Sequence, residues 1–264
     1  MSFSNPSTDS TKAVAGPDSE EGDASGATLG SRLLKIRHWL ARPIEARFIG
    51  RTVLPTIISE DCWGGEFCRR LAVPYNTPFA GAFIPATDYL SFLENIENKD
   101  AFNLERVPAA ENYPIGRTPY CVIHFIHYKT WEEARDKFRR RAQRINRATL
   151  CYKIDFGKAE YTQSDIERWN RLTLSTRVAL LSPQSRPGLD FSAVARSVKV
   201  PDWNIDGSAM FSIARRHFDF YHWLRTGEIR QSRWIRLLHF LLFDHVVFSG
   251  LKAKIRSIFC RPGA

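Results

Sequence analysis

The alternation of apolar and polar stretches along the chain predicts an ordered series of strands and helices. Short apolar runs predict buried strands at 53–59, 79–84, 120–128 and 150–156. Between them, apolar residues spaced three and four apart predict helices at 62–71, from 87 or 88 onward, at 130–146, 164–172 and 208–224. Strands that alternate with helices indicate an α/β fold, with a mostly parallel sheet flanked by helices.

The segment 120–128 has the clearest strand pattern in the chain. It is apolar on both faces, as expected for a central strand that is covered on each side. A period of two places His124 and His127 on opposite faces of this strand. The pattern assigns neither the polar segment 98–118 nor two apolar runs within 173–206.

Composition divides the chain into three parts. Residues 1–31 contain five acidic residues, one lysine and almost no large apolar side chains, which predicts a disordered acidic tail. Residues 32–228 contain the predicted strands and helices and form one α/β domain. Residues 229–264 contain seven Lys or Arg and one acid around an apolar stretch too short and too polar to span a membrane. They predict a basic amphipathic helical extension.

The formal net charge of +10 predicts an anionic partner. Nucleic acid, acidic lipid, a phosphorylated sugar and a nucleotide all fit this charge. Nucleic acid is the least expected, because no recognition-helix or aromatic-flanked glycine-loop pattern accompanies the charge. The aromatic and basic side chains of 229–264 suit an acidic membrane surface; the alternative is an ordinary helix that covers the sheet.

The five cysteines lie at irregular spacings without a Cys-x-x-Cys pair. This favours a reducing compartment and predicts neither a disulfide framework nor a metal site. No positively charged start followed by an apolar run indicates a secretory signal. We therefore expect a cytoplasmic protein, peripheral on the inner face of the cell membrane where the basic extension binds it. The sequence identifies no cofactor.

Candidate chemistry concentrates in the turn that follows the first predicted strand. Cys62 lies where that strand ends and a helix begins, so unpaired N–H groups and the helix dipole are expected to lower its thiol pKa. Gly64 and Gly65 allow a ligand to approach the backbone closely. The alternatives are a buried structural cysteine, or a turn that binds phosphate through the glycines and the helix N-terminus.

A nucleophilic Cys62 needs a base, which is usually a histidine. We expect His127, because it lies nearer the carboxyl end of its predicted strand, where ligands bind in open α/β sheets. His124 faces the other way, and a core histidine held by a hydroxyl or a carbonyl is its alternative role. Asp219 and His222 form a fallback Asp-x-x-His pair, similar to the acid–base pair of the Ser-Gly-Asn-His esterases and acyltransferases.

Further side chains close to these positions are candidate ligand-binding residues. In the Cys62 turn, the loop after it and the segment 120–128 they are Trp63, Tyr75, Asn76, Thr77, His124 and Tyr128. Arg139, Arg140 and Arg144 belong to a basic helix face, which is solvated by default and otherwise fits an anionic glycan or a lipid phosphate.

Several blocks of sequence occur together in one family. They are 58–65 (Ile-Ser-Glu-Asp-Cys-Trp-Gly-Gly), 75–79 (Tyr-Asn-Thr-Pro-Phe), 113–116 (Tyr-Pro-Ile-Gly) and 123–128 (Ile-His-Phe-Ile-His-Tyr). In this order they resemble bacterial exopolysaccharide biosynthesis proteins, over about residues 50–227. The resemblance implies a pathway, the assembly of surface polysaccharide, and no particular reaction.

The expected function combines this pathway with the Cys62 turn. The expected substrate is a sugar or glycan, and the leading reaction is acyl transfer to it at the cytoplasmic membrane face, with Cys62, His127 and Asp61 as catalytic residues. Asp61-Cys62 resembles the Asp-Ser start of the Ser-Gly-Asn-His enzymes, with sulfur replacing oxygen. Two alternatives remain: a non-catalytic glycan- or lipid-binding accessory protein, and a nucleotide-sugar or sugar-phosphate transferase that binds phosphate at the Gly64-Gly65 turn.

Overall fold

The computed structural model describes residues 43, 47, 49–50, 54–230 and 234 of the 264-residue chain. The predicted acidic tail and nearly all of the predicted basic extension lie outside the described residues. The fold is therefore described by the helices and strands between positions 54 and 230.

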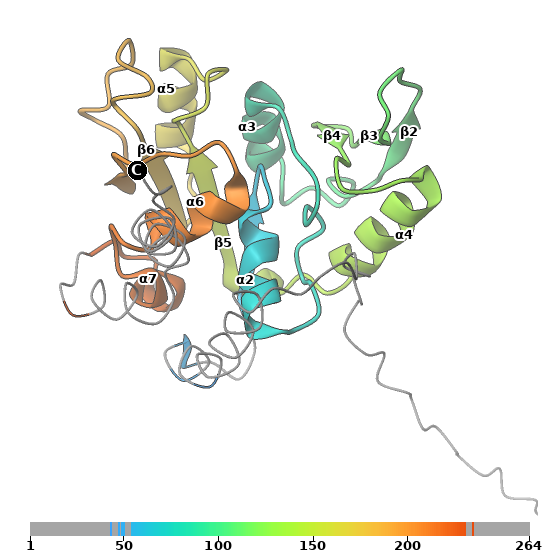
Figure 1. The fold of residues 1–264 in the computed structure, drawn as a ribbon, viewed down its shortest axis with the longest axis horizontal. Helices are drawn as coiled ribbons and strands as arrows, with labels where there is room; N and C mark the ends of the chain where they lie inside the picture. The colour runs from blue at the N-terminus through green and yellow to red at the C-terminus, as the bar shows by residue number, and fades with distance from the viewer. Residues whose placement is uncertain (1–42, 44–46, 48, 51–53, 231–233, 235–264) are drawn as a thin grey trace, which may run out of the picture.

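A four-stranded parallel sheet forms the centre of the molecule (Figure 1). Its strands are, in spatial order, β1 (Thr56–Ser59), β5 (Leu150–Asp155), β6 (Arg177–Leu181) and β7 (Ser197–Lys199). The helices that cover it are α2 (Trp63–Leu71), α3 (Ala86–Glu94), α5 (Gln163–Arg171), α6 (Gly207–Ala214) and α7 (Phe220–Thr226). The prediction of an α/β fold with a mostly parallel sheet is confirmed.

Both faces of the sheet are covered because alternate strand residues are apolar on each side. On one face, Ile58, Ile154 and Leu181 pack with residues of α3 and α5. On the other face, Ile57 and Leu180 pack with residues of α2, α6 and α7. This double burial explains why these strands appear in the sequence as nearly continuous apolar runs.

A smaller antiparallel sheet lies to one side of the parallel sheet (Figure 1). It consists of β2 (Glu105–Val107), β3 (Ile115–Arg117) and β4 (Val122–His124), and α4 (Trp131–Ala142) follows it. Two of its strands form within the polar segment 98–118, to which the pattern assigned none. The prediction of a central strand at 120–128 is wrong, because only β4 is a strand there and it pairs with β3.

The apolar pattern of 120–128 comes from burial outside a central strand. Ile123 and Phe125 are buried in the core on the α3 side of the parallel sheet, whereas Ile126 is 44% exposed. The Tyr128 N–H donates to the Phe125 carbonyl (3.0 Å), which turns the chain directly after β4. Apolar periodicity does not distinguish these two kinds of burial.

Two other predicted elements differ from the structure. The segment 79–84 is a turn followed by an isolated bridge at Phe83, because the positive φ of Gly81 (79°) interrupts an extended strand. The segment 208–224 is two helices and not one. The second of them, α7, starts anew because the Asp219 carboxylate accepts the His222 N–H (3.0 Å) and caps its N-terminus.

Other elements agree with the pattern. Thr130 accepts the Glu133 N–H (3.2 Å) and caps α4, which begins at the next residue, within the predicted helix 130–146. The two unassigned apolar runs within 173–206 contain β6 and β7.

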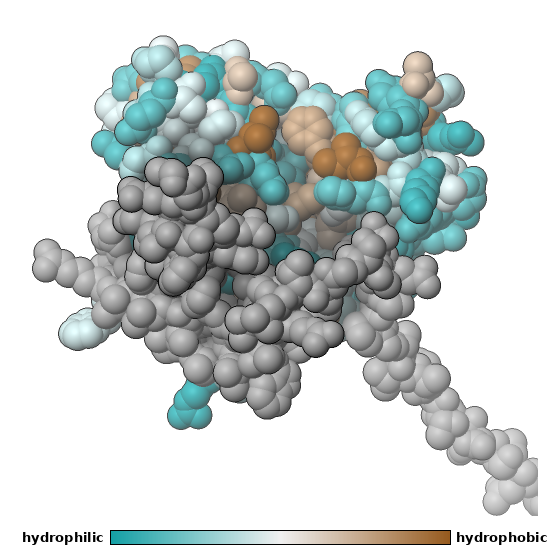
Figure 2. Space-filling model, viewed as in Figure 1, coloured by the Kyte–Doolittle hydropathy of each residue, from teal (hydrophilic) through white to brown (hydrophobic). Residues whose placement is uncertain are grey.

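The surface is hollowed between the part built on the parallel sheet and the part that carries the antiparallel sheet and α4 (Figure 2). Apolar side chains are visible within this hollow. Across the part of the chain that the structure describes, no helix combines the length and the apolar character needed to cross a membrane.

Candidate functional site

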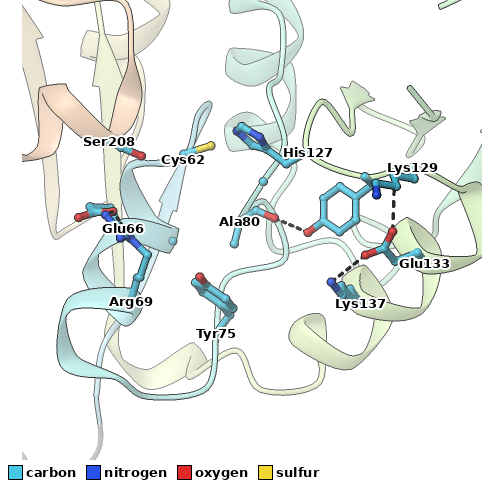
Figure 3. A pocket seen from close by; sticks show the side chains of 13 residues that line it. Cys62, Glu66, Arg69, Tyr75, Ala80, His127, Lys129, Glu133, Lys137 and Ser208 are labelled. Atoms are coloured by element: carbon cyan, nitrogen blue, oxygen red, sulfur yellow. Dashed lines mark hydrogen bonds and ion pairs between the residues drawn. The ribbon is translucent and has the colours of Figure 1, made fainter. Parts of the chain in front are cut away.

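A cavity of about 660 Å³ lies beside the start of α2 (Figure 3). Its walls come from α2, the loop that follows it, the segment after β4, the helix α4 and the start of α6. Of the residues that the sequence singled out, Cys62, Gly65, Tyr75, His127 and Tyr128 line it. The cavity thus brings the candidate nucleophile and its candidate base together from segments far apart in the chain.

The turn between β1 and α2 holds Cys62 at the cavity. The Ser59 hydroxyl donates to the Asp61 carbonyl (2.8 Å) and accepts the Gly64 N–H (3.0 Å). Gly64 packs so closely on β1 that an added Cβ would lie 2.4 Å from a backbone carbonyl oxygen of that strand. Cys62 is the N-cap residue but makes no side-chain cap hydrogen bond. Its sulfur points toward His127 (Figure 3).

In the same turn, backbone N–H groups that would be needed to bind a phosphate already donate hydrogen bonds within the protein. The N–H of Gly64 is bonded to Ser59, and the N–H of Trp63 donates to Asp61 Oδ1 (3.0 Å). Gly65 lines the cavity, but an added Cβ there would lie 2.9 Å from that of Ala80. The glycines therefore serve close packing, and two N–H groups at the start of α2 already have protein partners.

Gly81 connects the two candidate catalytic residues. Its carbonyl accepts the His127 N–H (3.2 Å), and its backbone favours the ionised form of the Cys62 thiol. An added Cβ at Gly81 would lie 2.9 Å from the Tyr128 ring, so this approach requires glycine. His127 reaches the cavity through a turn, and not, as predicted, from the end of a strand beside β1.

The prediction of a lowered pKa for Cys62 is wrong. Burial of the side chain raises the pKa of this thiol to about 11, and the neighbouring Asp61 carboxylate contributes in the same direction. The hydrogen bond from Gly81 acts in the opposite direction but does not compensate. Burial and the adjacent charge thus outweigh the helix dipole on which the prediction relied. A nucleophilic Cys62 therefore depends on a base that removes its proton.

Alkylation of Cys62 is expected to be slow at neutral pH and to accelerate across the alkaline range. With a pKa of about 11, about one thiol in 10⁴ is ionised at pH 7, and the rate rises about tenfold per pH unit. Labelling of the folded protein with iodoacetamide, followed by peptide mass spectrometry, measures this rate. The pKa of an ordinary cysteine thiol is about 8.5. A labelling rate that levels off near that pH would contradict the raised pKa of Cys62.

A buried ionic cluster lies next to Cys62, at the carboxyl ends of β1 and β5. It consists of Glu60, Asp61, Lys153, Asp155 and Lys158, none of them more than 7% exposed. Lys153 Nζ lies 2.8 Å from Asp61 Oδ2, 3.3 Å from Glu60 Oε1 and 3.8 Å from Asp155 Oδ2. Lys158 Nζ lies 3.3 Å from Glu60 Oε1 and 3.1 Å from Asp61 Oδ2.

The cluster sets the charge beside the turn. Burial opposes ionisation of Asp61, but the charges of Lys153 and Lys158 hold the pKa of this carboxyl well below its usual range. Burial raises the pKa of Glu60 and of Asp155, against the effect of the same two lysines. The Asp61 carboxylate forms ion pairs with both lysines and accepts the N–H of Trp63 at the start of α2, so it holds the Cys62 turn in place. Asp61 is not among the residues that line the cavity.

The remaining candidates around the turn have packing roles or line the cavity wall. Trp63 is fully buried in the aromatic core on the α2 side of the sheet. Asn76 donates to a backbone carbonyl just before β1 (3.1 Å), and Thr77 is buried. Tyr75 and Tyr128 provide two aromatic rings of the cavity wall.

The other candidate acid–base residues lie away from the cavity. His124 Nδ1 lies 3.4 Å from the Tyr113 hydroxyl, which matches the alternative role of a histidine held by a hydroxyl. Asp219 caps α7 by accepting the backbone N–H of His222, and the His222 ring lies 3.5 Å from Glu228. Neither Asp219 nor His222 lines the cavity.

Besides its basic face, α4 contains a buried arginine that is not among the predicted site residues. Arg139 and Arg140 are exposed, and Arg144 donates to the Tyr75 carbonyl (3.4 Å). Arg141 is only 1% exposed. Helical periodicity could have identified it, because 141 continues the buried stripe formed by positions 134 and 138.

Charged and polar residues that the sequence analysis did not select complete the cavity wall. They are Glu66, Arg69, Lys129, Glu133, Lys137 and Ser208. Glu66 and Arg69 follow Cys62 at helical spacings of four and seven, so periodicity places them on its side of α2. Ser208 comes from α6, which is far away in the sequence, and no comparable pattern in the sequence marks it.

A family model described as a domain of unknown function (DUF1919) matches residues 47–225, which is more than half of the chain. The chain belongs to this family. An uncharacterised protein of Haemophilus influenzae is 29% identical to it over 142 residues, which are 54% of this chain and 68% of that protein.

The DUF1919 match contains every residue that lines the cavity and all five residues of the ionic cluster. The predicted basic extension lies beyond it. In the described part of the DUF1919 domain, no group of three or more His, Cys, Asp or Glu side chains is arranged to hold a metal ion.

Proposed function

We propose that the protein is an enzyme of surface-polysaccharide assembly that transfers an acyl group to a sugar, with Cys62 as nucleophile and His127 as base. One observation carries the proposal: Cys62 and His127 lie at the wall of one cavity, and the Cys62 sulfur points toward His127 (Figure 3). A thiol and an imidazole held at a shared cavity are the minimal set for covalent acyl transfer.

The proposed reaction has two steps. In the first, the His127 imidazole takes the Cys62 proton while the sulfur attacks the carbonyl carbon of an acyl thioester. The donor thiolate leaves and takes the proton back from His127. In the second, a sugar hydroxyl gives its proton to His127 and attacks the carbonyl carbon of the Cys62 thioester. The Cys62 thiolate then leaves and is protonated by His127.

The cavity supports a sugar as acceptor. Its volume of about 660 Å³ falls within the range of small-ligand sites, about 300–1,000 Å³. Two tyrosine rings, Tyr75 and Tyr128, offer stacking surfaces between charged and polar side chains that can bond to hydroxyl groups. The resemblance to exopolysaccharide biosynthesis proteins supports the pathway. The basic and aromatic composition of 229–264 supports a position at the inner face of the cell membrane.

Incubation of the full chain with acetyl-coenzyme A tests the proposal. We expect a mass increase of one acetyl group, located on Cys62 by peptide mass spectrometry, and its loss when sugars are added. The Cys62→Ala variant controls for acetylation elsewhere. A protein that carries no acyl group at Cys62 with acetyl, succinyl or pyruvyl donors, or one that is not deacylated by any sugar, would refute covalent acyl transfer.

A second candidate is a non-catalytic glycan-binding accessory protein. The observation that favours it is the His127 ring, which has no hydrogen-bond partner among residues 54–230 to orient it, beside a thiol whose pKa is raised to about 11. Catalytic histidines are usually oriented by a third group. Glycan binding that is identical in wild type and Cys62→Ala, with no acyl-enzyme, would select this candidate.

A further inference from the structure

A buried arginine lies behind the cavity wall. Arg141 is 1% exposed, and each contact that the structure gives its guanidinium is to a residue that lines the cavity. Nη1 donates to the Ala80 carbonyl (2.8 Å) and to the Tyr128 hydroxyl, and the guanidinium carbon lies 4.5 Å from the centre of the Tyr75 ring. The Tyr128 hydroxyl in turn donates to the Ala80 carbonyl (2.5 Å).

In the part of the chain that the structure describes, no carboxylate balances the positive charge of Arg141. No carboxylate lies at ion-pair distance from it, and its Nε has no hydrogen-bond partner. Two other buried cations differ: Lys153 has three carboxylates around it, and Arg70 is paired with Glu66 (3.2 Å). Arg177 is also buried without a carboxylate partner among the described residues, but it does not line the cavity. Buried charges in proteins are normally paired, so an unpaired one beside a cavity indicates a missing anion.

The charged residues of the cavity wall do not supply that anion. Glu66 is paired with Arg69 (2.7 Å), and Glu133 is paired with Lys137 (2.9 Å). Lys129 adds a further positive charge and has no ion pair among residues 54–230. Once the two pairs are set aside, the cavity has Lys129 at its wall and Arg141 behind it, and both are cationic.

We propose that the cavity takes a sugar bearing an anionic group, a carboxylate or a phosphate, and that the unpaired Arg141 guanidinium behind Tyr75 and Tyr128 sets this preference together with Lys129. The inference rests on the proposed function only in taking the ligand to be a sugar. Arg141 is a positioning residue: it orients the Tyr128 hydroxyl and supplies positive potential through a wall of low dielectric, where charges act over longer distances than in water.

Binding of three matched sugars to the full chain tests the inference. Methyl glucoside is neutral, methyl glucuronide carries a carboxylate and glucose 6-phosphate carries a phosphate. By calorimetry we expect at least one of the charged sugars to bind about tenfold or more tightly than the neutral one, and the difference to shrink with added salt. The tighter of the two charged sugars identifies the anionic group.

Variants assign the preference to the named residues. Arg141→Met keeps similar volume without the charge and is expected to remove most of the preference. Lys129→Ala, at an exposed position, is expected to reduce it. Arg171→Met, at an exposed position at the end of α5 and outside the cavity wall, is the matched control and retains it.

Equal binding of the three sugars by the wild-type protein overturns the inference, and so does a preference that persists in Arg141→Met. Should Arg141→Met fail to fold, as its thermal melt would reveal, the wild-type comparison and Lys129→Ala decide. No acyl donor is present in these assays. Failure of acyl transfer therefore leaves their outcome unaffected, and acylation of neutral sugars alone would overturn the charge preference while sustaining the transferase.

Discussion

Lys153→Met is expected to destabilise the protein by about 3–5 kcal/mol at neutral pH, because it leaves a buried group of carboxylates without its main counter-charge. Lys153 Nζ lies within 4 Å of Glu60, Asp61 and Asp155, and all four residues are buried. The methionine side chain fills similar space, so the loss reports the charge and not a cavity. Urea unfolding followed by tryptophan fluorescence measures it.

The pH dependence of this loss has a definite sign. In the wild type, the two lysines depress the folded-state pKa of Asp61, so its contribution to stability is present above the unfolded pKa and is lost as pH falls through the folded value. In Lys153→Met the pKa of Asp61 loses its main depressing charge, and the pKa values of Glu60 and Asp155, which burial already raises in the wild type, rise further. Their contribution is then present below the unfolded pKa and lost as pH rises. The difference between wild type and variant should therefore shrink as pH falls from 7 toward 4.

Two further variants isolate the mechanism. Lys199→Met replaces an exposed lysine on β7 and is expected to change stability by no more than about 0.5 kcal/mol. Asp61→Asn added to Lys153→Met removes one of the orphaned charges and should recover part of the loss. If Lys153→Met lowers the free energy of unfolding no more than Lys199→Met does, the ionic cluster does not stabilise the fold as described. The same conclusion follows if Asp61→Asn lowers the stability of Lys153→Met by as much as it lowers that of the wild type.

The Lys153 cluster also illustrates which features of the fold the sequence could predict. Strand 150–156 was predicted correctly from its apolar residues, although two charged residues, Lys153 and Asp155, lie within it. Ionic groups in a strand that is otherwise apolar on both faces indicate a buried cluster, but their partners, Glu60 and Asp61, come from the turn after β1, far away in the sequence. Pattern analysis describes one segment at a time and cannot supply such a pairing.

For a similar reason, only part of the cavity could be predicted from the sequence. The acid, cysteine and glycine pattern located the turn between β1 and α2 correctly, since each of these residues acts on its own neighbours. His127 was selected on the expectation of a strand end beside β1, whereas its place results from the Gly81 turn. The raised pKa of Cys62 depends on burial, which a sequence motif does not report.

His127→Gln is expected to lower the rate of Cys62 acylation by about 10²–10⁴-fold, the usual contribution of a general base. The effect should be at the large end because burial raises the thiol pKa to about 11, so that few molecules react as thiolate without assistance. Glutamine keeps the size and the backbone of the residue, and the His127 N–H that bonds to Gly81 is unaffected. Single-turnover acylation by an acetyl thioester, followed by mass spectrometry, measures the rate without any sugar acceptor.

The pH profile separates a base from a merely structural residue. In the wild type the base assists removal of the Cys62 proton, so the acylation rate should rise by less than tenfold per pH unit. In His127→Gln the rate should instead rise about tenfold per pH unit, in parallel with the thiolate of Cys62. His217→Gln, which removes an imidazole paired with Asp202 outside the cavity, is the control and should leave the profile unchanged. A His127→Gln variant with the wild-type profile would show that Cys62 reacts without this base.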